Sequence, residues 1–156
     1  MKVKFTLIFT WLAVVGAVCF WPAHSSLALF NPHKIITDDD MEDYSRMSLA
    51  GVQAFLKNQG GALSNYSTTD LDGVQRTAAE IIYNTSYRYH LNPQFMIAQI
   101  QKESSLITSS NTDLADWVMG FAVCDSCSKD DPSVIQYKGF AKQLDAAGDR
   151  IRNYYL

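Results

Sequence analysis

Hydrophobic residues recur at intervals of three and four along most of the chain beyond residue 47, which is the spacing of an amphipathic helix. Ser48 is a residue type that caps helix N-termini, and Gly60-Gly61 is a typical helix stop. The apolar positions between them share one face of a helical projection: Leu49, Val52, Phe55 and Leu56. We therefore expect a helix between Ser48 and Gly60.

The same spacing predicts a second helix over about residues 70–89. Its apolar positions are Leu71, Val74, Ala78, Ile81 and Ile82. Asn92-Pro93 then predicts the start of a third helix, because Asn caps free backbone amides and Pro fits the first helical turn. We expect this third helix to run to about Leu106.

Two further helical patterns follow, separated by polar loops. A short helix capped by Asp113 would carry Leu114, Trp117, Val118 and Phe121. A final helix would carry on its inner side Phe140, Leu144, Ala147, Ile151 and Tyr154. No segment shows a convincing alternation of apolar and polar residues, which a half-buried strand would require. The expected fold class is therefore mainly α.

The N-terminus has the layout of a secretion signal. Lys2 and Lys4 precede an apolar run over residues 5–21, and the small-residue sequence Ser26-Leu27-Ala28 follows. The alternative is an uncleaved membrane anchor, but this run of 17 residues is shorter than the roughly 20 that a spanning helix needs. We expect residues 1–28 to be a signal peptide, with no stable membrane span after its removal.

The rest of the chain divides into an acidic lead segment, residues 29–47, and a helical domain, residues 48–156. The lead segment contains Asn31-Pro32 and the acidic run Asp38–Asp40, which predict a loosely held segment. Removal of residues 1–28 leaves 11 basic and 16 acidic side chains, a net charge of −5. Because nucleic-acid-binding domains are normally basic, we expect no nucleic-acid partner.

Two cysteines remain in the exported chain, Cys124 and Cys127. A zinc site needs four ligands, and no second cysteine pair is present, so we expect no metal and no cofactor. In an oxidising compartment the pair can form a local disulfide, with two free thiols as the alternative. A redox protein using this pair would need a strand-helix pattern that the sequence does not have.

One carboxylate stands out in the helix that starts at Asn92. On a helical wheel the apolar positions fall within one broad arc: Phe95, Met96, Ile97, Ile100, Leu106 and Ile107. Glu103 falls inside that arc, and the neutral amide of Gln99 falls beside it. The wheel therefore predicts that Glu103 lies on the buried face of the helix.

A carboxylate on a buried face must be paired, protonated or directed into a cleft, because burying an unpaired charge costs several kcal/mol. One interpretation is a structural salt bridge, with Arg76, Arg88 or Lys102 as the partner. Lys102 should point away, since it is adjacent in sequence. The other interpretation is a functional acid. The helical wheel by itself leaves both interpretations open.

The stretch Asn92-Pro-Gln-Phe-Met-Ile-Ala-Gln-Ile-Gln-Lys-Glu-Ser-Ser-Leu resembles the catalytic helix of the lysozyme-like superfamily, especially bacterial lytic transglycosylases and goose-type lysozymes. In these proteins the helix ends in Glu-Ser and the Glu is the catalytic acid, which corresponds here to Glu103-Ser104. The order Trp117-Val-Met-Gly-Phe followed by Gly139-Phe-Ala-Lys-Gln is similar to secreted bacterial proteins with such a domain. The resemblance covers roughly residues 30–156 and implies a compact lysozyme-like helical domain over 48–156.

The resemblance implies cleavage of the β-1,4 glycosidic bond of peptidoglycan, between MurNAc and GlcNAc, by a secreted or cell-envelope enzyme. Glu103 would be the general acid, since a glutamic acid in an apolar pocket can protonate the leaving oxygen. Hydrolysis would use a second carboxylate, for which the nearest candidates are Asp113, Asp116 and Asp125. A lytic transglycosylase needs none, and we favour that chemistry because no Asp pairs convincingly with Glu103.

Substrate contacts are expected from Ser104 and Gln99, which lie beside Glu103, and from three aromatic residues that could stack on sugar rings: Trp117, Phe121 and Tyr154. Each aromatic residue also has the spacing of a core position. The chain departs from the transglycosylase pattern, because Met119-Gly-Phe-Ala stands for the family's Gly-Leu-Met-Gln. An alternative function is therefore an inactive glycan-binding or scaffold module of the cell envelope.

Overall fold

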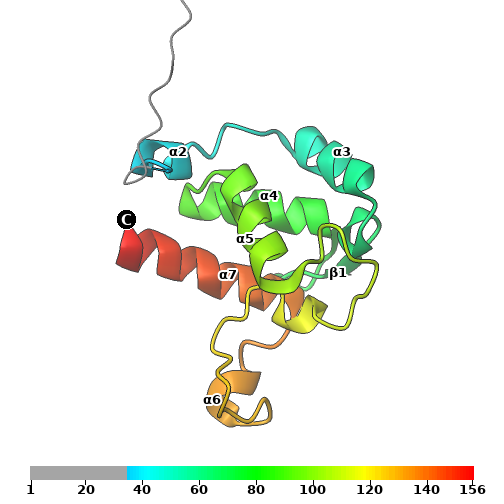
Figure 1. Cartoon of the computed structure of the whole chain (residues 1–156), viewed down its shortest axis with the longest axis vertical. Helices are drawn as coiled ribbons and strands as arrows, with labels where there is room; N and C mark the ends of the chain where they lie inside the picture. Colours follow the sequence, from blue (N-terminus) through cyan, green and yellow to red (C-terminus); the bar gives the residue numbers. More distant parts are fainter. Residues whose placement is uncertain (1–34) are drawn as a thin grey trace, which may run out of the picture. The chain divides into compact units, whose positions relative to one another are not determined.

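The computed structural model describes residues 35–156 (Figure 1). The expected signal peptide, residues 1–28, and the first part of the lead segment lie outside the described residues. None of the helices in residues 35–156 is long and apolar enough to cross a membrane.

The described part of the chain contains six α-helices and one short hairpin. In chain order the elements are α2 (Asp38–Glu42), α3 (Leu49–Gln59), η1 (Ala62–Ser64), β1 (Ser67–Thr69), β2 (Gln75–Thr77), α4 (Ala78–Tyr89), α5 (Pro93–Ser104), η2 (Ala115–Trp117), α6 (Pro132–Ile135), α7 (Phe140–Arg150) and η3 (Ile151–Tyr155). The prediction of a mainly α fold is confirmed.

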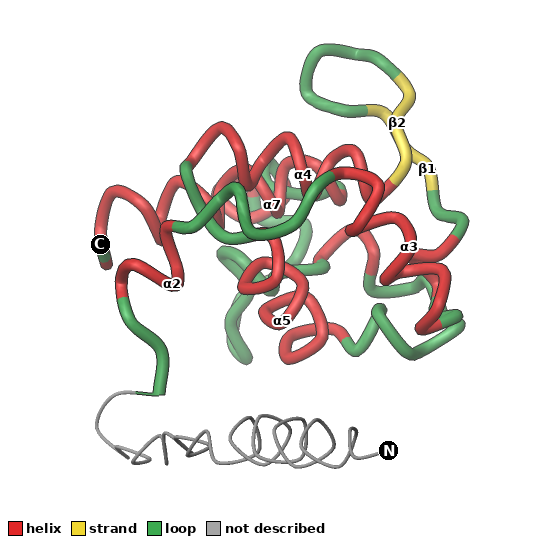
Figure 2. Tube along the Cα trace, turned by 90° about the horizontal axis from the view of Figure 1, so that it is seen from above, coloured by secondary structure: helices red, strands yellow, loops and turns green. Residues whose placement is uncertain are grey.

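Helix α4 lies at the centre of the core and packs against α3, α5 and α7. Figure 1 shows α4 between α3 and α7, and Figure 2 shows the same helices from above. Two faces of α4 are buried at once, because adjacent pairs such as Ile81 and Ile82 both lack solvent exposure. Fully buried partners from the neighbouring helices include Val52, Leu56, Met96, Ile100, Phe140 and Leu144.

The helix predicted after Ser48 is confirmed as α3. The Ser48 hydroxyl accepts a hydrogen bond from the Gly51 backbone N–H at 3.2 Å, which satisfies one of the free amides of the first turn. Gly60 ends the helix in the left-handed conformation, with φ of 69°, and donates its N–H to the Leu56 carbonyl. The capping chemistry therefore determines both ends of this helix.

The prediction of a helix from residue 70 is wrong for its first part. Residues 67–77 form an antiparallel hairpin, with Ser67 opposite Thr77, and α4 begins only at Ala78. A capping box starts the helix there, because the Thr77 side chain accepts from the Glu80 N–H while the Glu80 carboxylate accepts from the Thr77 N–H. The apolar residues that suggested an earlier start, Leu71 and Val74, are about half exposed in the turn.

The lead segment is attached to the helical domain more firmly than its composition predicts. Thr37 caps α2 within the acidic run, and residues 36–156 form one compact unit. The Asn92 N–H donates to the Met41 carbonyl at 2.7 Å, and the Asn92 side-chain amide donates to the Asp40 carbonyl at 2.8 Å. A loosely held segment is therefore the wrong description of residues 37–42. Their tertiary hydrogen bonds to Asn92 hold them in place despite the acidic composition that predicted a loose segment.

Arg76 pairs with both acidic side chains of the hairpin turn. Its guanidinium contacts Asp70 at 2.8 Å and makes two hydrogen bonds to Asp72, at 2.6 and 2.7 Å. These bonds favour the ionised carboxylate, and the side-chain hydrogen bond from Arg76 is the largest cause that lowers the pKa of Asp72 to about 2.

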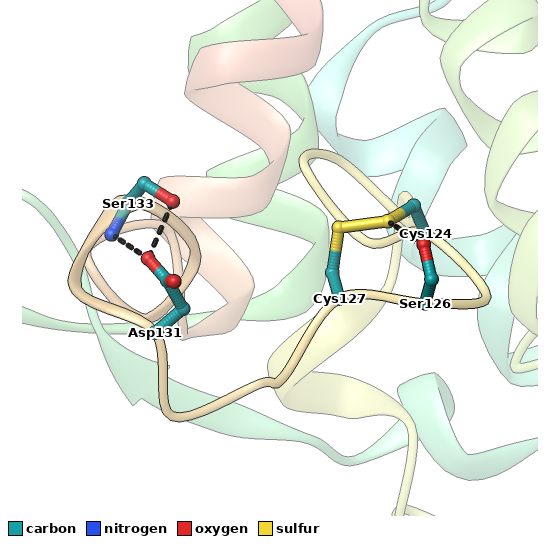
Figure 3. Close-up of a disulfide and its surroundings, with 5 residues drawn as sticks. All are labelled: Cys124, Ser126, Cys127, Asp131 and Ser133. Carbon is teal, nitrogen blue, oxygen red and sulfur yellow. Dashed lines mark hydrogen bonds between the residues drawn. A yellow bond between two sulfur atoms is a disulfide. The ribbon is translucent and has the colours of Figure 1, made fainter.

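We expect Arg76→Gln to raise the pKa of Asp72 from about 2 toward the ordinary value of about 3.9. Because the folded pKa lies below the unfolded one, the stabilisation is present above about pH 4 and is lost as the pH falls toward 2. A carboxyl ¹³C titration measures this. Asp131 is the internal control, because Ser133 lowers its pKa by two hydrogen bonds (Figure 3) that Arg76 does not touch. An unchanged Asp72 titration would contradict the prediction.

Adjacent glycines at the end of α3 serve different physical purposes. Gly60 has a positive φ with open space around its Cα, whereas a Cβ on Gly61 would overlap the carbonyl group of Ile107. We expect Gly61→Ala to cost about 2 kcal/mol or more, because a backbone carbonyl cannot move aside cheaply. Gly60→Ala should cost about 1 kcal/mol, from left-handed strain alone. Urea unfolding compares the two variants, and equal losses would contradict the close approach of Gly61 to Ile107.

Candidate functional site

Glu103 lies in the last turn of α5, at the edge of the buried face. The helix ends at Ser104, and Ser105 adopts the left-handed conformation with φ of 57°. Leu106 and Ile107 are buried, but they belong to the chain after this turn and not to the helical wheel. Leu106, near 280° on the wheel, and the half-buried Phe95, near 260°, extended the predicted arc past Glu103. The prediction that Glu103 lies on the buried face is wrong, because Glu103 is exposed.

The buried positions that do belong to α5 define a narrower face: Pro93, Met96, Ile97, Ile100 and Ser104. With Met96 at zero and about 100° per residue, this face spans about 0° to 100°, and Glu103 falls near 340°. The Glu103 side chain is accordingly 35% exposed. A carboxylate at this boundary is accessible to a ligand while one side of it contacts protein.

The ion-pair partner of Glu103 is its sequence neighbour. Lys102 Nζ lies 3.0 Å from Glu103 Oε1, and the Lys102 side chain is 73% exposed. The expectation that Lys102 points away is therefore wrong, because two exposed side chains at a helix end are free to turn toward each other. Arg76 pairs with Asp70 and Asp72, and Arg88 pairs with Asp145, so neither arginine makes a buried bridge to Glu103.

The second oxygen of Glu103 lies near the segment of residues 117–123, which comprises the last residue of η2 and the irregular loop after it, and which we call the site loop. A Cβ on Gly120 would lie 3.6 Å from Glu103 Oε2, so the Gly120 backbone borders the carboxylate directly. Gly120 and Ala122 both have positive φ, at 62° and 61°. Two short turns shape the loop, with Gly120 N–H donating to the Trp117 carbonyl and Val123 N–H to the Gly120 carbonyl.

Trp117 and Phe121, predicted to contact substrate, belong to the site loop. Trp117 is half-buried, and Lys129 Nζ lies 5.9 Å from the centre of its ring. Phe121 is also half-buried and meets Tyr137 edge to face, with ring centres 4.9 Å apart. Half-burial leaves part of each ring exposed for contact with a ligand, although Phe121 also packs against the hydrophobic core. The structure therefore brings these two predicted residues to the same loop that borders Glu103.

The two predicted polar contacts differ in exposure. Ser104 is buried, and its hydroxyl donates to the Ile100 carbonyl within α5 at 2.9 Å. This hydroxyl is therefore occupied by a helix bond, which weakens its role as a substrate contact. Gln99 is half-buried one turn before Glu103 on the same helix.

Tyr154 does not join the other predicted site residues. It is 70% exposed, and its ring packs against Tyr155 and the Arg150 guanidinium. The prediction that it lies on the inner side of the last helix is wrong. Residues 151–155 form a wider π-helical turn, in which the α-helical spacing that placed Tyr154 on the inner side no longer applies.

The last turn is located at the opposite end of α5 from Glu103. Arg152 pairs with Glu42 of α2 at 2.9 Å, and α2 is hydrogen-bonded to Asn92 at the start of α5. Twelve helical residues separate the two ends by about 18 Å. Figure 1 shows the C-terminus beside α2. Tyr154 therefore cannot contact a sugar held at Glu103.

The three aspartates considered as a second carboxylate are engaged elsewhere or exposed. Asp113 accepts a hydrogen bond from the Asn111 side-chain amide, and it does not cap η2, whose N-cap is Leu114. Asp116 lies 3.7 Å from Lys138 Nζ, and Asp125 is exposed in the cysteine loop. Within residues 35–156 no three His, Cys, Asp or Glu side chains gather as a possible metal site.

Cys124 and Cys127 form a disulfide, with Cα atoms 5.1 Å apart (Figure 3). The bond closes the loop that directly follows the site loop, and the Cys127 N–H also donates to the Cys124 carbonyl. The cysteine spacing left open a disulfide or two free thiols, and the structure has the disulfide.

Sequence reasoning did not identify Gln143 as part of the site. Gln143 is completely buried in α7, and its side-chain amide is hydrogen-bonded to the site loop at Phe121. The available signal was a polar residue between the inner positions Phe140 and Leu144 of the last helix. A helical wheel, which singled out Glu103 as a polar residue on an apolar face, would have found Gln143 in the same way.

The described residues thus define a mainly α-helical domain in which an accessible carboxylate at the end of one helix lies beside an aromatic loop. The chain belongs to the family described as LasA, N-terminal domain, whose family model matches residues 34–156. No curated protein and no solved structure matches this chain.

Proposed function

We propose that this domain cleaves the β-1,4 glycosidic bond of peptidoglycan, with Glu103 as the general acid. The observation that carries the proposal is the position of Glu103, whose carboxylate is accessible and borders the Gly120 backbone of an aromatic loop. The Glu-Ser helix ending and its resemblance to lytic transglycosylases add the reaction class. Trp117 and Phe121 supply ring surfaces for sugar residues.

The chemistry requires two successive proton transfers, one from Glu103 and one back to it. Glu103 donates its proton to the glycosidic oxygen as the bond from C1 to that oxygen breaks. The ionised Glu103 then takes the proton of the sugar's own 6-hydroxyl while O6 bonds to C1 and closes an anhydro ring. Glu103 is thereby returned to its acid form, and no water is consumed. In the hydrolytic version a water molecule replaces the 6-hydroxyl.

The transglycosylase route is favoured because Glu103 has no evident carboxylate partner. Asp113 and Asp116 are each engaged with another side chain, and Asp125 belongs to the exposed cysteine loop. A general acid also works best away from water, and Glu103 is partly exposed. We infer that the bound glycan itself covers the carboxylate and displaces Lys102 from it.

The second candidate function is a glycan-binding module without catalysis. The specific observation in its favour is that Glu103 is 35% exposed and is paired with an exposed lysine. Such a module would bind peptidoglycan and release no soluble fragments. Incubating residues 29–156 with purified peptidoglycan and determining the masses of soluble products distinguishes the two functions. Products that lack one water relative to hydrolysis indicate the anhydro ring.

We expect Glu103→Gln to abolish fragment release while the protein stays folded. The glutamine has nearly the same shape but has no proton to give, and the broken ion pair is exposed, so the loss of stability should be about 0 to 1 kcal/mol. Turnover and the thermal midpoint are measured on the same sample. Fragment release by the variant at the parent rate would exclude Glu103 as the acid.

Glu42→Gln is the matched control for this variant. Glu42 has a side-chain exposure of 40% and an ion pair of 2.9 Å to Arg152, close to the 35% and 3.0 Å of Glu103. It lies in α2, at the opposite end of α5 from the site. The control should keep full turnover and lose more stability than Glu103→Gln, because Arg152 Nη1 is buried and Lys102 is exposed.

We also propose that the domain acts outside the cytoplasm, in the cell envelope or after secretion. The signal-like N-terminus and the disulfide of the cysteine loop support this location. The exported protein should lack residues 1–28, and its intact mass should not change on alkylation without reduction. A product that retains the apolar run would instead indicate an anchor, and added alkyl groups would indicate free thiols.

A further inference from the structure

The amide of Gln143 makes three tertiary hydrogen bonds from a fully buried position. Its Oε1 accepts from the Phe121 N–H at 2.9 Å, and its Nε2 donates to the Phe121 carbonyl at 3.1 Å. Nε2 also donates to the Tyr137 carbonyl at 3.0 Å. One side chain therefore satisfies both backbone groups of Phe121, as a neighbouring β-strand would, and joins two segments that lie on either side of the cysteine loop.

The site loop has few other hydrogen bonds to the rest of the domain. Its internal bonds close turns of four residues, and the contacts of Phe121 with Tyr137 and of Val118 with the core are apolar. Apolar contacts are not directional, so they hold a loop in place without determining the orientation of its backbone. The hydrogen bonds of Gln143 do determine that orientation at Phe121.

Gly120 directly precedes Phe121 and is the backbone that borders Glu103 Oε2. A shift of the Phe121 peptide therefore moves the wall of the site next to the carboxylate. Because Gln143 comes from α7 and Glu103 from α5, this contact also ties the site to two different helices. A misplacement of about 1 Å near reacting groups can lower a rate about 100-fold.

We propose that Gln143 is a positioning residue, which holds the site loop at Phe121 and thereby sets Gly120 against the Glu103 carboxylate. The role in turnover rests on the proposed glycan cleavage, whereas the placement of Gly120 against Glu103 does not. Gln143 touches no substrate atom in this arrangement. It acts through the loop backbone alone.

Amide hydrogen exchange of the unmodified protein tests the contact without any variant. The Phe121 N–H should exchange at least roughly tenfold more slowly than the exposed amides of the adjoining cysteine loop, because a buried acceptor protects it. Exchange of the Phe121 N–H at the rate of those exposed amides would overturn the proposal, whether or not the protein cleaves glycan.

Two variants test the consequence for the site, Gln143→Glu and Gln143→Met. The first keeps an acceptor for the Phe121 N–H and loses the two donated bonds, whereas the second loses all three. Both should lower kcat per folded molecule, by about 100-fold for the second, with a smaller change in KM. Gln136→Met is the matched control, because Gln136 is exposed and bonds only to Ser133 within its own turn.

A purely structural role predicts a different result, which is a lower thermal midpoint with unchanged kcat per folded molecule. That result would overturn the proposal while leaving the proposed function intact. If the parent protein releases no fragments, the proposed function fails, and the ¹³C shift of the Glu103 carboxyl becomes the deciding measurement. A shift changed by Gln143→Glu and unchanged by Gln136→Met supports the positioning role, and an unchanged shift in both variants overturns it.

Discussion

The burial of α4 is the interaction on which the rest of the domain depends. Ile81 and Ile82 are adjacent and both buried, so α4 needs apolar partners on more than one side, and α3, α5 and α7 provide them. The approach of α7 is especially close, because a Cβ on Gly148 would overlap the Tyr89 ring. With α5 and α7 both docked on α4, the end of α5 and the beginning of α7 are set at defined positions.

The candidate site follows from those two positions. Glu103 comes from the last turn of α5, and the buried amide of Gln143 comes from the end of the first turn of α7. The loop between the two helices is irregular, yet it is attached to both, through Gly120 beside Glu103 and through the Phe121 backbone on Gln143. A chemically simple site, with one carboxylate and an aromatic loop, can therefore be built on a small helical scaffold.

Sequence patterns predicted the elements whose limits are set by local chemistry. Ser48 and Gly60 bound α3, and Asn92-Pro93 starts α5, because capping bonds form within one turn of the chain. The hairpin at residues 67–77 was missed, since its few residues carry no alternation and its turn is held by Arg76 and two aspartates. Helical spacing of Leu71 and Val74 suggested burial that these residues do not have.

The sequence alone determined the mainly α fold, the starts of α3 and α5 and the carboxylate to be considered, because periodicity and capping are local properties. Only the tertiary structure decided how Glu103 lies. The left-handed Ser105 ends α5, so Leu106 and Ile107 do not belong to its buried face, and Glu103 lies accessible beside Lys102 at the end of the helix. The attachment of residues 37–42 to Asn92 and of the site loop to Gln143 likewise depends on tertiary hydrogen bonds, between residues 52 and 22 positions apart. Local sequence patterns carry no information about such bonds.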